Sequence, residues 1–198
     1  MERVPPGVDS ASGIRSVSNP GEVDDVGVAP RSRVYTWADP QPAAQAVRQL
    51  SGLEVLQGTS GGAVPRPPAL ETLGIAPVEV ESGRVVFEMT PEEWHYNLLG
   101  SVHGGILATL ADTALGCAVH TRLPAGTGYT TQGINMNFLR PVTMETGPIR
   151  CEGIALNVGR RTAYATASIT DLTGRLLGHA TTTCLLLPGG GHQPTSTV

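Results

Sequence analysis

The segment from residue 104 to residue 120 constrains the fold of this chain more than any other. It reads GGILATLADTALGCAVH, and its apolar residues occupy so many helical positions that they cover nearly the whole circumference of a helix. Such a helix must be buried on most sides, so the rest of the chain has to wrap around it. Its one carboxylate, Asp112, then needs a partner or a function, because burying an unpaired carboxylate costs several kcal/mol.

Six segments around this helix have the alternation or the β-branched composition of strands. Two precede it, at 77–81 and 84–90, and the Ser82-Gly83 turn between them predicts a hairpin. The short links between the last three segments favour an antiparallel meander. The four segments after the helix are 129–139, 148–157, 162–171 and 175–187. The order predicts an α+β fold in which a long antiparallel sheet of about six strands wraps around the central helix.

The chain before residue 69 has a different composition. Residues 1–34 are rich in Pro, Gly and Ser without any period, which predicts a disordered N-terminal extension. Residues 35–68 read as a helical segment and a Gly- and Pro-rich strap, and Gly52 leaves open one helix or two short pieces. The regular domain is expected at 69–187, with a flexible tail at 188–198.

Composition and charge argue against several classes of protein. The formal net charge of -4, without a basic stripe, argues against nucleic-acid binding. No apolar run approaches the roughly 20 residues of a membrane span, and no signal peptide is visible, so we expect a cytoplasmic protein without a membrane partner. We expect buried free thiols at Cys117, Cys151 and Cys184. No cluster of His, Cys and Asp has the spacing of metal ligands.

The polar turn before the helix is the best candidate for a binding site. Residues 97–105 read NLLGSVHGG, so two glycines lie where the helix begins. The first N–H groups of a helix have no internal partner and form the positive end of its dipole. Glycine lets a carbonyl approach them closely. The alternative is a glycine turn that packing alone requires.

The string HGGILATLAD at 103–112 resembles the signature of the PaaI-like acyl-CoA thioesterases, which have the hotdog fold. Asn97, six residues before His103, and the strings FLRP at 138–141 and GRR at 159–161 extend the resemblance over about residues 69–187. The resemblance implies a hotdog fold with an N-terminal helical prelude from about residue 38. It also implies hydrolysis of an acyl-CoA to a carboxylic acid and CoA, with no cofactor.

The resemblance assigns roles to the residues around the turn. Asp112 is the general base or the nucleophile, and the N–H of Gly104 or Gly105 polarises the thioester carbonyl. The alternative for Asp112 is a buried carboxylate that caps a backbone group. Asn97 is implied to hold a water or the carbonyl, although an Asn that stabilises its own turn is common. For His103 an orienting or structural role is favoured over direct proton transfer.

Further residues are implied less directly. A Ser or Thr after the helix assists the carboxylate in the family; counting from Pro141 points to Thr131 and counting from Asp112 to Thr130, and we favour Thr131. The resemblance also implies arginines that bind the phosphate groups of CoA. The alternative is that these arginines only lie in solvated turns. These candidates are Arg160, Arg161 and, more weakly, Arg140. The remaining loop and helix-end histidines, His95 and His120, are expected to be partly exposed.

Spacing along the helix adds an argument about assembly. Gly104 and Asp112 lie eight residues apart, which is about 12 Å along a helix axis. Groups that act on one carbonyl must lie within about 3 Å of it, so the two would have to come from different subunits. A two-fold dimer achieves this, and we expect a homodimer or a dimer of dimers.

Two rival functions remain at this point. A non-catalytic acyl-CoA-binding hotdog sensor or scaffold would have no use for an ionisable group at Asp112. A hotdog hydratase or dehydratase fits the spacing between the glycines and Asp112 poorly. The acyl group is expected along the dimer interface, where Trp94 and Tyr96 favour an aryl or medium-chain group.

Overall fold

The computed structural model describes residues 30–189. Contacts divide the chain into two units, one ending at Val34 and the other beginning at Tyr35. Residues 30–34 form no helix or strand, and everything below concerns the second unit. The disorder expected for the N-terminus falls mostly on residues 1–29, and the flexible tail mostly on residues 190–198, which lie outside the described residues.

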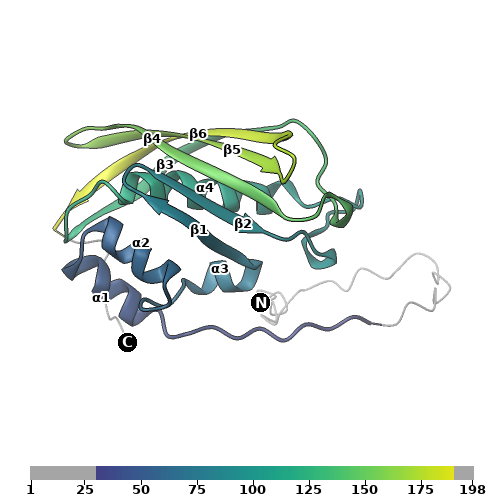
Figure 1. Cartoon of the computed structure of the whole chain (residues 1–198), viewed down its shortest axis with the longest axis horizontal. Coiled ribbons are helices and arrows are strands. Elements are labelled where there is room, and N and C mark those ends of the chain that lie inside the picture. Colours follow the sequence, from purple (N-terminus) through teal and green to yellow (C-terminus); the bar gives the residue numbers. More distant parts are fainter. Residues whose placement is uncertain (1–29, 190–198) are drawn as a thin grey trace, which may run out of the picture. The chain divides into compact units, whose positions relative to one another are not determined.

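One antiparallel sheet forms the body of this unit (Figure 1). Its strands are β1 (Ile75–Glu81), β2 (Arg84–Met89), β3 (Thr127–Phe138), β4 (Ile149–Val158), β5 (Thr162–Asp171) and β6 (Leu176–Pro188). The order across the sheet is β1-β2-β4-β5-β6-β3, which confirms the hairpin and the meander. Strand β3 follows the helix in sequence yet lies beside β6, so β1 and β3 are the edges of the sheet.

The predicted central helix is α4 (Gly104–His120), and the sheet curves over it (Figure 1). It packs against β2 to β6, and its most deeply buried side chains are Leu110, Ala111, Ala114, Leu115, Ala118 and Val119. The contact is close because β4 has a glycine there: a Cβ on Gly153 would lie 2.2 Å from the carbonyl oxygen of Ala114. The α+β fold with a wrapped helix is therefore confirmed.

Three short helices precede the sheet: α1 (Gln41–Gln49), α2 (Gly52–Ser60) and α3 (Pro68–Leu73). The break before Gly52 is a capping box, in which Ser51 Oγ accepts from the N–H of Glu54 and the Glu54 carboxylate accepts from the N–H of Ser51. Glycine is needed at 52 because a Cβ there would overlap the carbonyl group of His120. The segment is therefore two helices, and α2 packs on the C-terminal end of α4.

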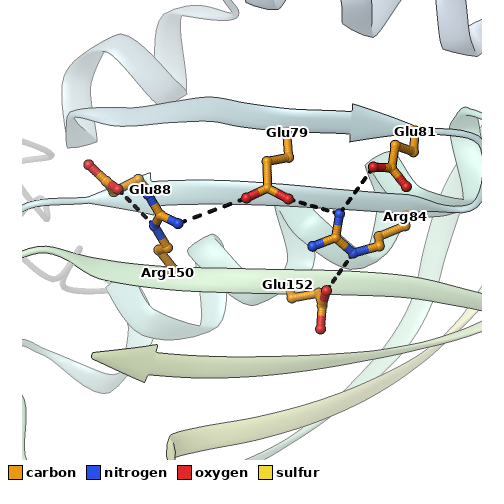
Figure 2. A network of polar contacts seen from close by, with 6 residues as sticks. All are labelled: Glu79, Glu81, Arg84, Glu88, Arg150 and Glu152. Carbon is orange, nitrogen blue, oxygen red and sulfur yellow. Dashed lines mark hydrogen bonds and ion pairs between the residues drawn. The ribbon is translucent and has the colours of Figure 1, made fainter. Parts of the chain in front are cut away.

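The face of the sheet turned away from α4 carries a charged network across β1, β2 and β4 (Figure 2). Arg84 forms ion pairs with Glu79 at 2.9 Å and with Glu81 at 3.6 Å, and its shortest ion pair is with Glu152. Arg150 contacts Glu88 at 3.1 Å and Glu79 at 3.8 Å. This network joins three strands through alternating charges. Among the described helices, none has the length and apolar character that crossing a membrane requires.

Candidate active site

The N-terminus of α4 begins on the predicted pair of glycines, and His103 caps it. The N–H of Gly105 donates to His103 Nδ1 at 2.9 Å, and the N–H groups of Ile106 and Leu107 donate to the carbonyl of His103. The N–H of Gly104 has no acceptor among the described residues. Of the two candidate donors, Gly104 is therefore available and Gly105 is occupied. His103 acts here as the helix cap, which agrees with an orienting role.

Asn97 uses its amide oxygen to hold its own turn. Asn97 Oδ1 accepts from the N–H of Leu99 at 2.8 Å and from that of Ser101 at 3.5 Å. Its Nδ2 makes one long hydrogen bond, 3.4 Å to Ser101 Oγ. Asn97 and Gly104 nevertheless line the same cavity of about 320 Å³, together with Phe138, Leu139 and Arg140. The amide nitrogen can therefore donate a further hydrogen bond near the N-terminus of α4.

Asp112 and Thr131 meet directly. Thr131 Oγ1 donates to Asp112 Oδ1 at 2.8 Å. Thr130 is exposed, because successive side chains of a strand point to opposite faces. The structure therefore brings Thr131, and not Thr130, to the carboxylate. Asp112 is half-buried, on a helix face that also carries the partly exposed Thr109 and Thr113.

Within one chain, the candidate residues around Gly104 lie far from those around Asp112. Thr131 pairs with Cys184 on β6, whereas Phe138, which lies against Gly104, pairs with Gly178. Cys184 and Gly178 lie six residues apart on β6, which corresponds to about 20 Å at 3.3 Å per residue. Asn97 and Gly104 are thus at one end of the molecule, and Asp112 and Thr131 lie toward the other.

The three candidate arginines divide between these two ends. Arg140 lines the cavity beside Gly104, and its guanidinium donates to the carbonyl of Leu176. Arg160 and Arg161 form the exposed turn between β4 and β5. Through the register of β5, β6 and β3 this turn lies at the level of Thr130, close to the Asp112 end. They do not form one cluster within a chain.

Sequence reasoning missed a group of polar side chains beyond Asp112. His120 is buried rather than partly exposed, because α2 covers it, and burial lowers its pKa. His95 is buried too, and its Nδ1 accepts from the N–H of Glu92. Tyr129 packs against both Cys117 and His120. Helical spacing could have linked His120 to Asp112, because residues 112, 116 and 120 share one face of the helix.

The three cysteines are free, as expected; Cys151 and Cys184 are buried, and Cys117 is half-buried. Loss of hydration raises the pKa of the Cys117 thiol to about 12, with the Asp112 charge adding to the rise against a hydrogen bond with Tyr129. Burial also raises the pKa of Cys151 to about 12. Thiols of this kind stay protonated at neutral pH and are poor nucleophiles.

Comparison with known proteins places this geometry in a family. The thioesterase superfamily model matches residues 99–177. A 1,4-dihydroxy-2-naphthoyl-CoA hydrolase of Listeria monocytogenes is 29% identical over 54% of this chain and 85% of its own. A candidate esterase of Saccharolobus solfataricus is 32% identical over 52% of this chain and 72% of its own.

A solved structure supports the fold. The PaaI protein from the phenylacetic acid degradation operon of E. coli superposes with a TM-score of 0.62 at 22% identity, covering 71% of this chain and 98% of its own. The apolar helix, the wrapped sheet and the family match agree with the resemblance read from the HGG string. The chain is a thioester hydrolase that belongs to the thioesterase superfamily, and it shares the hotdog fold of the PaaI protein.

Proposed function

We propose that this protein hydrolyses the thioester of an acyl-CoA to a carboxylic acid and CoA at a site shared by two copies of the chain. The hydrogen bond from Thr131 to Asp112 carries the proposal. It fixes the orientation of a lone carboxylate on an otherwise apolar helix. The helix face that carries this carboxylate is partly exposed. A pure acyl-CoA sensor would have no need for such a group.

In the proposed mechanism, the N–H of Gly104 polarises the thioester carbonyl and stabilises the oxyanion that forms. Asp112 either takes a proton from the attacking water or attacks the carbonyl itself, in which case the C–S bond breaks and water then hydrolyses the mixed anhydride that forms. In the first route, a C–O bond forms to water, the C–S bond breaks, and the proton held by Asp112 passes to the leaving thiolate. Asn97, which lines the same cavity as Gly104, would bind the carbonyl or the water through Nδ2, and Thr131 would hold the carboxylate.

The exposed edge of β3 supports the shared site. Residues 132–135 are all exposed, and an unpaired sheet edge of this kind invites pairing with another chain. If two β3 strands pair antiparallel about a two-fold axis at Asn135, Ile134 of one copy lies opposite Met136 of the other. Because β3 has an irregularity between Thr131 and Gly133, residues 131 and 132 then both lie opposite residue 138. Phe138 lies against Gly104, so Asp112 of one copy would approach Gly104 of its partner.

The same pairing explains the division of the arginines. Arg140 lies near the Gly104 end, and Arg160 and Arg161 lie near the Asp112 end. In the dimer these ends would meet, so guanidinium groups from both copies would be available to the phosphates of one CoA. The cytoplasm remains our proposed compartment, because three free thiols are typical of a reducing environment.

The test is thiol release from a panel of acyl-CoA substrates by the wild type and by Asp112→Asn. Removing a general base lowers turnover by about 10²–10⁴-fold, while the isosteric amide keeps the fold. The control is Glu81→Gln, which neutralises an exposed carboxylate of the sheet. No turnover on any thioester, together with tight acyl-CoA binding by both proteins, would favour the sensor.

A further inference from the structure

A second cavity, of about 380 Å³, lies away from the Asn97–Gly104 turn. Its walls come from α1, α2, the strap at 64–68, the C-terminal half of α4 and the start of β3. Almost all the side chains are apolar; the polar exceptions are Thr59, Cys117, His120 and Tyr129. We call it the α1 cavity. No step of the proposed reaction involves this cavity.

Helix α1 forms a loose cover over this cavity. Its apolar face, formed by Ala43, Ala44 and Val47, lines the cavity, yet none of its residues is buried. A nine-residue helix is marginal in water unless its apolar face is packed. Helix α1 is joined to the body by the hydrogen bond from the N–H of Gly126 to the carbonyl of Val47, 3.1 Å. An apolar occupant would complete the packing that α1 lacks.

The α1 cavity and the candidate carboxylate lie along the same face of α4. Asp112, Gly116 and His120 follow one another at four-residue steps on one face of α4, so they span about 12 Å along its axis. The ring of Tyr129 lies on Gly116, where a Cβ would come 2.5 Å from the ring, and its centroid is 5.5 Å from that of His120. Tyr129 lines the cavity and, two residues before Thr131 on β3, shares its face. Its ring therefore marks the boundary between Asp112 and the cavity.

We propose that the α1 cavity receives the alkyl chain of a fatty acyl thioester whose carbonyl is attacked beside Asp112, so that the enzyme acts on medium- to long-chain acyl-CoA. This inference rests on the proposed function. The chain would run along the Gly116 face of α4, displace the Tyr129 ring and end beneath α1. The cavity is apolar and partly open, and it has no guanidinium or ammonium group in its lining, which suits a hydrocarbon and not a polar or charged acyl group.

The test compares the wild type with Val47→Trp, which fills the cavity from α1, and with Gln45→Trp, which adds the same side chain at an exposed position of the same helix. We measure kcat/KM for butanoyl- and dodecanoyl-CoA and the binding of dodecanoate by calorimetry. Val47→Trp should lower kcat/KM for dodecanoyl-CoA by about tenfold or more, because excluding two or more methylenes from apolar surroundings has roughly that effect. Butanoyl-CoA should change less than about twofold.

The outcomes separate this inference from the proposed function. If no acyl-CoA is hydrolysed but dodecanoate binds the wild type and not Val47→Trp, the cavity assignment stands and the hydrolase proposal fails. If Val47→Trp handles dodecanoyl-CoA and dodecanoate like the wild type, or if both substrates fall equally, the assignment is wrong. Ala44→Phe, which projects into the same cavity, replaces Val47→Trp if that variant melts early.

Discussion

At the scale of single residues, the hydrogen bond between Asp112 and Thr131 is the feature with the most direct consequence for activity. Thr130 and Thr131, near the start of β3, are the two candidates by sequence for this role, and their side chains point to opposite faces of the strand. The structure gives the bond to Thr131. This choice between neighbours depends on which face of β3 turns toward α4, and that is decided by packing.

Replacing Thr131 by valine tests the role of this hydroxyl. Thr131→Val keeps the shape of the side chain and removes the hydrogen bond to the carboxylate, which is worth about 1.5–3 kcal/mol for a charged acceptor. We expect kcat for acyl-CoA hydrolysis to fall by about 10- to 100-fold. Thr130→Val is the matched control and should leave kcat nearly unchanged. Equal losses in both variants would show that the hydroxyl of Thr131 has no special role.

At the scale of elements, the charged network of Figure 2 joins β1, β2 and β4 on the outer face of the sheet. β1 is an edge strand with one strand partner, so side-chain contacts add to its attachment. Hydrogen bonds to Glu152 and Glu79 raise the pKa of Arg84, in keeping with its central place in the network. The network also leaves this face charged, which makes it a poor surface for apolar association.

Replacing Arg84 by glutamine measures what the network contributes. Arg84→Gln should lower the free energy of unfolding by about 1 kcal/mol, because exposed ion pairs contribute 0–1 kcal/mol each and the side chain is 33% exposed. The loss should shrink at high salt, as screening weakens the pairs in the wild type. Urea unfolding at low and high ionic strength gives both values. Arg48→Gln, on α1, controls for the change in net charge; a loss that salt does not alter would point to packing instead.

At the scale of the whole molecule, the exposed edge of β3 and the division of the site residues predict that activity depends on association. Ile134 is 38% exposed at the middle of this edge. Exposed apolar side chains also gather where the partner is proposed to lie; they are Leu98, Leu99, Phe138 and Leu139. Larger exposed apolar areas of this kind mark interaction sites.

A lysine at the centre of the edge should separate the copies. Ile134→Lys places two like charges close together across the proposed axis, and lysine is what natural sheet edges use to prevent pairing. We expect sedimentation to show monomers, with turnover reduced by about 10²-fold or more because Gly104 and Asp112 no longer meet. Leu156→Lys, at an exposed position of β4, should change neither. A fully active monomer of the wild type would refute the shared site.

The sequence by itself determined the elements and the family. The hydrophobic pattern placed α4 and the strands to within two residues at each end, because helical and strand periods are local properties. The HGG string and Asp112 indicated the family because they are contiguous. The distance between Gly104 and Asp112 along the helix also followed from the sequence, since each residue of a helix adds a constant rise.

The tertiary structure decided what depends on distant segments meeting. It placed β3 at the edge beside β6 and gave Thr131 the bond to Asp112. It also made His103 the cap for Gly105, while the N–H of Gly104 has no acceptor within residues 30–189. It also formed the α1 cavity from segments that lie more than sixty residues apart in sequence, from Ala43 to Tyr129. Such contacts have no local signature, because packing, and not spacing along the chain, determines which side chains face one another.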